Sequence, residues 1–207
     1  VSLKDLYKKG QEGQDTTHFS ILDKNGNRVA GTLSINYPFG ASFVVPGTGV
    51  LLNNEMDDFS ASPLAPNAYG LVGNHANSIQ PGKRPLSSMT PTFLETKGKI
   101  GILGTPGGSR IISMVLLSSL EFVQGQKPSV WVSKERFHHQ YLPDLLQFEK
   151  DAFPLALQND LRKKGHKLKE ISRKYGNMQA VLWDKSERVV YVASDPRGEG
   201  AAVKQDP

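Results

Sequence analysis

The sequence predicts a mixed α+β fold in which strands come first, helices follow and strands close the chain. Residues 19–36 have the alternation of a β-hairpin, residues 111–120 carry apolar side chains at helical spacing, and residues 178–193 have the pattern of another hairpin. With 207 residues and no internal repeat, the chain is long enough for one well-cored domain or for one half of a larger one.

The first hairpin turns at Asn25-Gly26, the dipeptide that most strongly favours a tight hairpin turn. Pairing across this turn would bring Ser34 and Asn36 back alongside Thr16, so that three polar side chains converge at one end. The two strands are expected at residues 19–23 and 28–36.

The middle of the chain is expected to be mostly irregular. Residues 50–52 are interpreted as a short buried strand and residues 53–58 as a polar turn. Residues 60–85 have the composition of a long loop, and a loop of this length in a compact domain is usually functional or disordered. We interpret its first part as a lid, with Tyr69 as the side chain that covers a pocket.

The second half of the chain carries the main helix, which opens at Gly107-Gly108-Ser109 and ends near Gly125. Its apolar stripe predicts one buried face. The other elements are expected as a hairpin at residues 92–95 and 100–104, helices at 129–137 and 153–164, a strand at 145–148, and a last hairpin at 178–183 and 189–193.

Composition excludes several classes of function. The formal net charge is +5, but the basic residues are scattered, and the one dense patch (162–169) is interpreted as a solvated helix end rather than a nucleic-acid site. The absence of cysteine excludes disulfides, thiolate catalysis and cysteine-based zinc sites. No apolar run is long enough for a membrane span, and residues 1–9 lack the hydrophobic core of a signal peptide. His138, His139 and His166 are interpreted as structural, so no metal site is expected.

A threonine pair, Thr16-Thr17, ends a polar, glycine-containing arm and stands just before the strand expected at 19–23. A threonine hydroxyl is a poor nucleophile at neutral pH and needs a nearby base. Were the bond before Thr16 cut, its own α-amino group, which titrates near 8, would supply that base. A bare threonine pair is usually an ordinary strand start, so this interpretation depends on the motifs that follow.

Two further motifs have both a chemical and a plain interpretation. Glu55 and Asp58 lie three residues apart in a polar turn and could bind an ammonium group or only solvent. A magnesium or calcium ion would need further oxygen ligands at fixed spacing, which this turn lacks. Gly107 and Gly108 precede a helix, where unpaired backbone N–H groups could form an oxyanion hole or a simple turn. Ser87-Ser88 offers hydroxyl donors but carries no signal alone.

These motifs occur together in an order that resembles one known family. The order is Thr16-Thr17-His18, then Thr32-Leu33-Ser34-Ile35-Asn36, Asn53 to Ser60, Pro81 to Met89, and Pro106-Gly107-Gly108-Ser109-Arg110. The chain resembles the small subunit of gamma-glutamyltranspeptidase, an N-terminal nucleophile hydrolase. The resemblance implies an αββα sandwich of which this chain forms the central strands and one helical layer.

The resemblance also implies residue roles. It implies autocatalytic cleavage between Asp15 and Thr16, which separates a pre-cleavage arm (1–15) from a small-subunit domain (16–207). Thr16 would then be the nucleophile, with Ser34, a serine where the family usually has threonine, beside it. The implied oxyanion donors are Gly107 and Gly108, and the implied ligands of the donor substrate are Asn36, Glu55, Asp58, Ser87 and Ser88.

The implied activity is γ-glutamyl transfer from glutathione or other γ-glutamyl amides to water, amino acids or peptides, without a cofactor. It implies a large subunit from the same precursor as partner, and a periplasmic or secreted location. Two alternatives stay open: a related acylase or poly-γ-glutamate depolymerase of the same fold, and an orphan light chain that acts as a binding module. The turn at Ser194-Asp195 is expected to serve packing.

Overall fold

The computed structural model describes residues 16–62, 65–67 and 71–205. The predicted arm (1–15), including Asp15, and the predicted lid residue Tyr69 therefore lie outside the described residues. Within these ranges the strands are β1 (Thr16–Leu22), β2 (Arg28–Ser34), β3 (Thr92–Glu95), β4 (Lys99–Gly104), β5 (Phe137–His138), β6 (Leu146–Glu149), β7 (Leu168–Ile171), β8 (Gln179–Asp184) and β9 (Val189–Ser194). The helices are α2 (Ile111–Val123), α3 (Pro128–Ser133) and α4 (Leu155–Lys163), with 3₁₀ turns η1 (Glu55–Asp58), η2 (His75–Asn77) and η3 (Gly108–Arg110).

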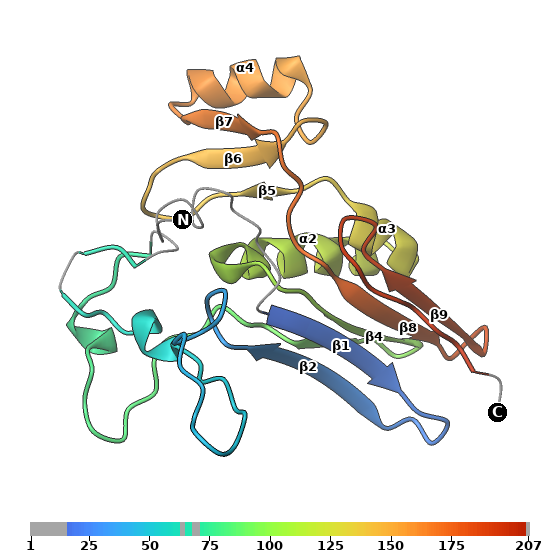
Figure 1. Ribbon diagram of the computed structural model, residues 1–207. Helices are drawn as coiled ribbons and strands as arrows, with labels where there is room; N and C mark the ends of the chain where they lie inside the picture. The colour runs from blue at the N-terminus through green and yellow to red at the C-terminus, as the bar shows by residue number, and fades with distance from the viewer. Residues whose placement is uncertain (1–15, 63–64, 68–70, 206–207) are drawn as a thin grey trace.

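The core is built in layers around the antiparallel sheet β3-β4-β8-β9. Helices α2 and α3 cover one face of this sheet, and the hairpin β1-β2 covers the other (Figure 1). The alternation of β4 explains both contacts, because Ile100 and Ile102 pack toward the hairpin while Leu103 packs toward the helices. The described residues thus supply one helical layer and two β layers.

The hairpin β1-β2 confirms the predicted turn. Gly26 has a φ of 86° and its N–H donates to the Asp23 carbonyl over 3.1 Å. The strands are paired in register from Leu22–Arg28 to Thr16–Ser34. The first strand begins at Thr16, earlier than predicted, so the threonine pair belongs to the strand itself.

A smaller sheet, β5-β6-β7, stands apart from the main layers together with α4 (Figure 1). Leu146, Phe148 and Phe153 form its own core. The helix expected at 129–137 was too long, because it ends at Ser133 and residues 137–138 pair with β6 instead. The patch at 162–169 contains the end of α4 at Lys163, and residues 162–167 are exposed, in agreement with a solvated helix end. No strand was predicted at β7, which pairs in parallel with β6, because a partner distant in sequence leaves no local signal.

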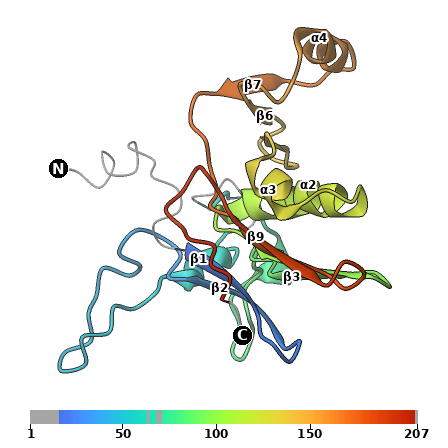
Figure 2. The ribbon, with the colours of Figure 1, turned by 90° about the vertical axis from the view of Figure 1, so that its right-hand side faces the viewer.

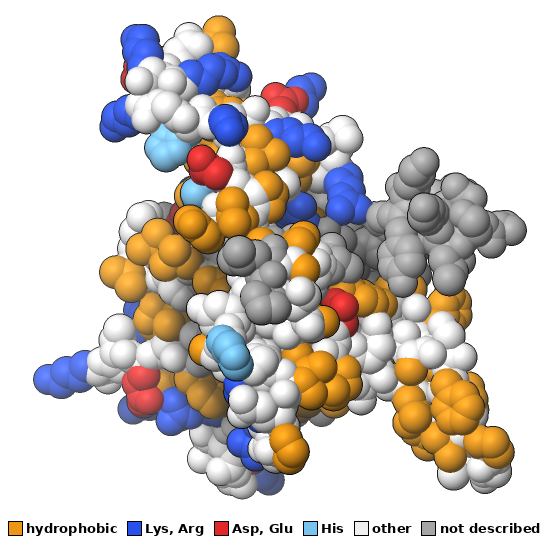
Figure 3. Space-filling view, turned by 90° about the vertical axis from the view of Figure 1, so that its left-hand side faces the viewer, with side chains coloured by type: hydrophobic (Ala, Val, Ile, Leu, Met, Phe, Trp, Pro, Cys, Tyr) orange, Lys and Arg blue, Asp and Glu red, His pale blue; other side chains and the backbone are white. Residues whose placement is uncertain are grey.

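The short buried strand predicted at residues 50–52 was also wrong. These residues belong to a ribbon, residues 41–52, in which Val44 and Leu51 form an isolated bridge. The ribbon projects from the body of the molecule (Figure 2) and its apolar side chains face outward, as Figure 3 shows at its lower right. Val50 is 53% exposed because no described sheet packs against it.

Four charged side chains join the smaller sheet to the main layers. The Arg197 guanidinium donates to Glu149 of β6 over 2.8 and 3.0 Å and to Asp195 over 3.3 Å. Arg136 forms a buried ion pair with Asp195, whose Oδ2 also accepts the Met178 N–H over 3.1 Å. The turn at residues 194–198 is therefore a structural junction, as predicted.

Candidate active site

The hairpin positions the candidate nucleophile. Thr16 and Ser34 are register partners at the open end of β1-β2, and their side chains lie on the same face of the hairpin. Thr16 Oγ1 and Ser34 Oγ are 2.8 Å apart. The predicted convergence of these two hydroxyls is present in the structure.

Asn36 lies two residues beyond β2, which ends at Ser34 and is therefore shorter than the strand predicted at 28–36. Its backbone N–H donates to Ser34 Oγ over 2.9 Å, and its Nδ2 donates to the Asn54 carbonyl over 3.1 Å. Asn36 is buried and has a φ of 72°, a left-handed conformation that asparagine tolerates better than most residues. These bonds fix the end of β2 against the turn that carries the acidic residues.

That turn, η1, holds Glu55 and Asp58 on its inner side. Burial, the neighbouring charges of Glu55 and Asp57, and a hydrogen bond with Glu55 raise the pKa of Asp58 to about 6. Within the described residues Glu55 Oε1 is buried without a hydrogen-bond partner. The Tyr37 hydroxyl donates to Asp57, so this third acid has a hydrogen-bond partner of its own. The pair is thus an acidic site with unused acceptor capacity.

The glycine turn before α2 adopts conformations that only glycine accommodates easily. Gly107 has a φ of 144° and Gly108 a φ of 57°. A Cβ at Gly107 would lie 2.5 Å from Met114 Cε, so α2 packs directly against this turn. Gly108 begins η3, which continues into α2, so its N–H belongs to the unpaired donors at a helix start.

One cleft brings these segments together. It is small, about 30 Å³, which is room for about one water molecule, so a larger ligand requires side chains to move. Gly108 lines the cleft, whereas Gly107 is buried and is not among the lining residues. The lining residues are Thr16, Ser34, Asn36, Glu55, Asp58, Leu71, Ser87, Ser88, Met89, Gly108, Ser109 and Ile111.

The sequence interpretation overlooked His18, which lies behind the nucleophile. It is 5% exposed, and its ring nitrogens lie 2.8 Å from Thr32 Oγ1 and 3.0 Å from Ser20 Oγ. Burial lowers the pKa of His18 to about 4, so the ring is neutral at pH 7. The sequence did contain a signal for His18. Residues 16, 18 and 20 are all polar, and alternate residues of a strand share one face, here the face toward β4.

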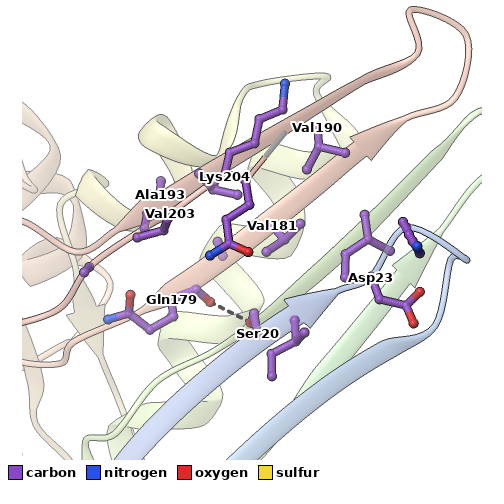
Figure 4. A pocket seen from close by; sticks show the side chains of 16 residues that line it. Ser20, Asp23, Gln179, Val181, Val190, Ala193, Val203 and Lys204 are labelled. Atoms are coloured by element: carbon purple, nitrogen blue, oxygen red, sulfur yellow. Dashed lines mark hydrogen bonds between the residues drawn. The ribbon is translucent and has the colours of Figure 1, made fainter. Parts of the chain in front are cut away.

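A larger cavity of about 800 Å³ lies toward the turn end of the same hairpin, between β1, β8, β9 and residues 201–205. Figure 4 shows that its walls are mainly apolar and that Ser20 donates to the Gln179 carbonyl at its base. It contains none of the candidate catalytic residues. In the part of the chain that the structure describes, no three His, Asp or Glu side chains form a metal-binding group, and no helix is long and apolar enough to cross a bilayer.

Comparison with protein families decides what kind of chain this is. A family model described as gamma-glutamyltranspeptidase matches residues 2–205. The chain belongs to the gamma-glutamyltranspeptidase family. The resemblance inferred from the order of the sequence motifs is thereby confirmed.

Two curated relatives, both named glutathione hydrolase proenzyme, are longer than this chain. The glutathione hydrolase proenzyme of Pseudomonas aeruginosa is 42% identical over 214 residues, which cover 100% of this chain and 38% of the relative. That of Escherichia coli is 45% identical over 190 residues, which cover 90% of this chain and 32% of the relative. The chain therefore spans about a third of the length of these relatives.

A solved gamma-glutamyltranspeptidase structure from Helicobacter pylori confirms the fold. It is 43% identical, with a TM-score of 0.81, over 88% of this chain and 100% of the solved chain. The layered α+β architecture is thus the small-subunit part of the N-terminal nucleophile hydrolase fold, as predicted. The solved chain is matched over its whole length, in contrast to the proenzymes.

Proposed function

We propose that this chain is the nucleophile-bearing subunit of an enzyme that transfers and hydrolyses γ-glutamyl groups. The observation that carries the proposal is the cleft, in which Thr16, the acidic pair Glu55 and Asp58, and the serine pair Ser87-Ser88 meet although they are far apart in sequence. A donor with an ammonium, a carboxylate and an amide needs these three kinds of partner in one place.

The nucleophile is Thr16 Oγ1, released for chemistry by cleavage of the Asp15–Thr16 bond. The freed α-amine of Thr16 is the general base, and the Ser34 hydroxyl, 2.8 Å from Thr16 Oγ1, positions the attacking oxygen and relays its proton. Thr16 Oγ1 attacks the γ-carbonyl carbon of the donor and forms a γ-glutamyl ester. The amine part of the donor leaves with the proton taken from Thr16. Water or an acceptor amine then attacks the ester and restores Thr16.

The other cleft residues bind what the reaction needs. Backbone N–H groups of Gly107 and Gly108 stabilise the oxyanion, an interaction worth about 3–4 kcal/mol for one donor. Glu55 and Asp58, with Asn36, bind the α-ammonium, which gives the buried Glu55 Oε1 a cationic partner. Ser87 and Ser88 bind the α-carboxylate. No step calls for a cofactor.

The partner we propose is a large subunit cut from the same precursor. A longer precursor fits the coverage, since this chain matches 38% of the proenzyme of P. aeruginosa and 100% of the solved H. pylori chain. The outer face of β1-β2 also exposes Phe19, Ile21 and Leu33, where the fold's second helical layer would pack. Residues 1–15 would be the arm that cleavage detaches. Tyr69 would be the lid residue, and the enzyme would be periplasmic or extracellular.

Replacement of Thr16 tests the proposal. In the precursor expressed with its upstream segment, we expect Thr16→Ala to abolish both cleavage before residue 16, read by intact mass, and release of the dye from a chromogenic γ-glutamyl anilide. The matched control is Thr17→Ala, since Thr17 is exposed and its side chain lies on the opposite face of β1. We expect this control to cleave and turn over normally.

Three outcomes would contradict the proposal. Cleavage that persists in Thr16→Ala would remove Thr16 from its role. A processed enzyme that releases other acyl groups and leaves the γ-glutamyl anilide intact would indicate the related acylase or depolymerase. A precursor that never loses residues 1–15 would indicate a binding module without catalysis.

A further inference from the structure

The proposed donor site has two sides that belong to different loops. Glu55 and Asp58 come from η1, whereas Ser87 and Ser88 come from the segment that leads into β3. Neither loop is a strand of a sheet, so no ladder of backbone hydrogen bonds sets the distance between them. An α-amino acid nevertheless has its ammonium and carboxylate at a fixed separation, so the two loops need a defined spacing.

One side-chain amide bridges the two loops. Asn77 Nδ2 donates to the Asp58 carbonyl over 2.7 Å, and Asn77 Oδ1 accepts the Leu86 N–H over 3.0 Å. Asp58 is itself a proposed ligand, and Leu86 is the residue before Ser87. A third bond, from the Ser60 N–H to the Asn77 carbonyl over 2.9 Å, ties the same residue to the chain just after η1.

The chemistry of this bridge suits asparagine in particular. It needs one donor and one acceptor on a short, planar group, which the carboxamide provides. Aspartate would keep the acceptor for Leu86 but would set a carboxylate oxygen against the Asp58 carbonyl. Alanine would lose both bonds.

The bridge is held in place by its own turn. Asn74 is the N-cap of η2, and its Oδ1 accepts the Ala76 N–H over 2.9 Å. Asn77 closes this turn by donating its backbone N–H to the Asn74 carbonyl over 3.1 Å. Asn77 is not among the residues that line the cleft, so it acts through its neighbours rather than on a ligand.

We propose that Asn77 is the positioning residue that fixes the spacing between the acidic and the serine sides of the donor site. Through this spacing it sets the preference for donors that carry an α-ammonium and an α-carboxylate. The inference rests on the proposed function, and it adds a specificity determinant outside the cleft.

The test compares two chromogenic donors on the processed enzyme made from the full precursor. One is a γ-glutamyl anilide, and the other is the glutaryl anilide, which keeps the carboxylate and lacks the α-amino group. For Asn77→Ala we expect KM for the γ-glutamyl donor to rise about 10-fold or more, with kcat within about 3-fold. The glutaryl donor should change little, so discrimination between the donors falls about 10-fold.

Two further variants make the result specific. Asn77→Asp keeps the size of the side chain and the acceptor for Leu86, so it provides a folded enzyme if the alanine variant is unstable, and we expect the same loss of discrimination. Asn74→Ala removes a cap from the same turn without removing the bridge, and we expect it to keep discrimination within about 3-fold of wild type. Intact mass reports whether each variant still cleaves before Thr16.

The failures can be told apart. An unchanged KM and unchanged discrimination in Asn77→Ala or Asn77→Asp, in an enzyme whose wild type prefers the γ-glutamyl donor, would overturn the inference alone. An equal loss with both donors, or an Asn74→Ala variant as poor as Asn77→Ala, would also overturn it, because the effect would then be general destabilisation. A wild type with no preference for the γ-glutamyl donor would overturn the proposed function as well.

Discussion

Thr16 Oγ1 and Ser34 Oγ lie 2.8 Å apart at the open end of the first hairpin, and Ser34 Oγ also accepts the Asn36 N–H over 2.9 Å. Ser34 therefore connects the candidate nucleophile to the loop that leads to the acidic turn. The hydroxyl, rather than the size of the side chain, makes both contacts. Serine in place of the threonine usual in the family keeps them.

Removal of this hydroxyl should slow turnover. We expect Ser34→Ala to lower kcat for a γ-glutamyl anilide by about 10- to 100-fold, because Thr16 Oγ1 loses its neighbour and proton relay. Ser34→Thr restores the hydroxyl and should stay within about 3-fold of wild type. Steady-state kinetics on processed enzyme measure both variants. Equal activity in Ser34→Ala would exclude a role for this contact.

Gly104 should be essential for stability because the His18 ring occupies the space that a side chain there would need. A Cβ at Gly104 would lie 2.3 Å from His18 Cε1. We expect Gly104→Ala to lower the free energy of unfolding by about 1–3 kcal/mol, the usual cost of overpacking a core. Gly98→Ala, where a Cβ would meet nothing within 4 Å, is the matched control. Denaturant unfolding measures both, and equal effects would contradict the prediction.

The same histidine should make stability depend on pH. The pKa of His18 is about 4 in the folded chain and about 6.5 in the unfolded chain, which therefore binds more protons between these values. Stability should fall as the pH decreases from about 6.5 to about 4, by up to about 3 kcal/mol from this group. His18→Gln should flatten this part of the profile. Unfolding curves at pH 7 and pH 4.5 measure the loss of stability in wild type and in His18→Gln. An equal loss in both proteins would contradict the prediction.

Asp58 should control donor binding near pH 6. Its raised pKa of about 6 means that the carboxyl becomes neutral below this pH and no longer attracts the α-ammonium. We expect kcat/KM for the γ-glutamyl anilide to rise with pH through about 6, and Asp58→Asn to remove this step and raise KM by at least about 10-fold. A pH profile of wild type and variant measures it. An acid limb that survives in Asp58→Asn would assign the step to another group.

The sequence alone predicted the parts that depend on local chemistry. The Asn25-Gly26 turn, the helix that follows Gly107-Gly108 and the last hairpin have signals within a few residues, and each is present in the structure. Prediction from the sequence failed at residues 50–52, at the end of α3 and at β7. At these places the secondary structure depends on which distant segment packs alongside. A local pattern contains no information about such a partner.

For the site, the sequence determined the candidate residues, namely a threonine at the start of a strand, two acids three residues apart and glycines before a helix. Tertiary structure decided that Thr16, both acids and Gly108 share one cleft, and it alone placed His18 behind the candidate nucleophile and Asn77 between the two loops. The physical reason is that both side chains act through hydrogen bonds to residues 9 to 19 positions away. Only the folded chain brings such partners within 3 Å.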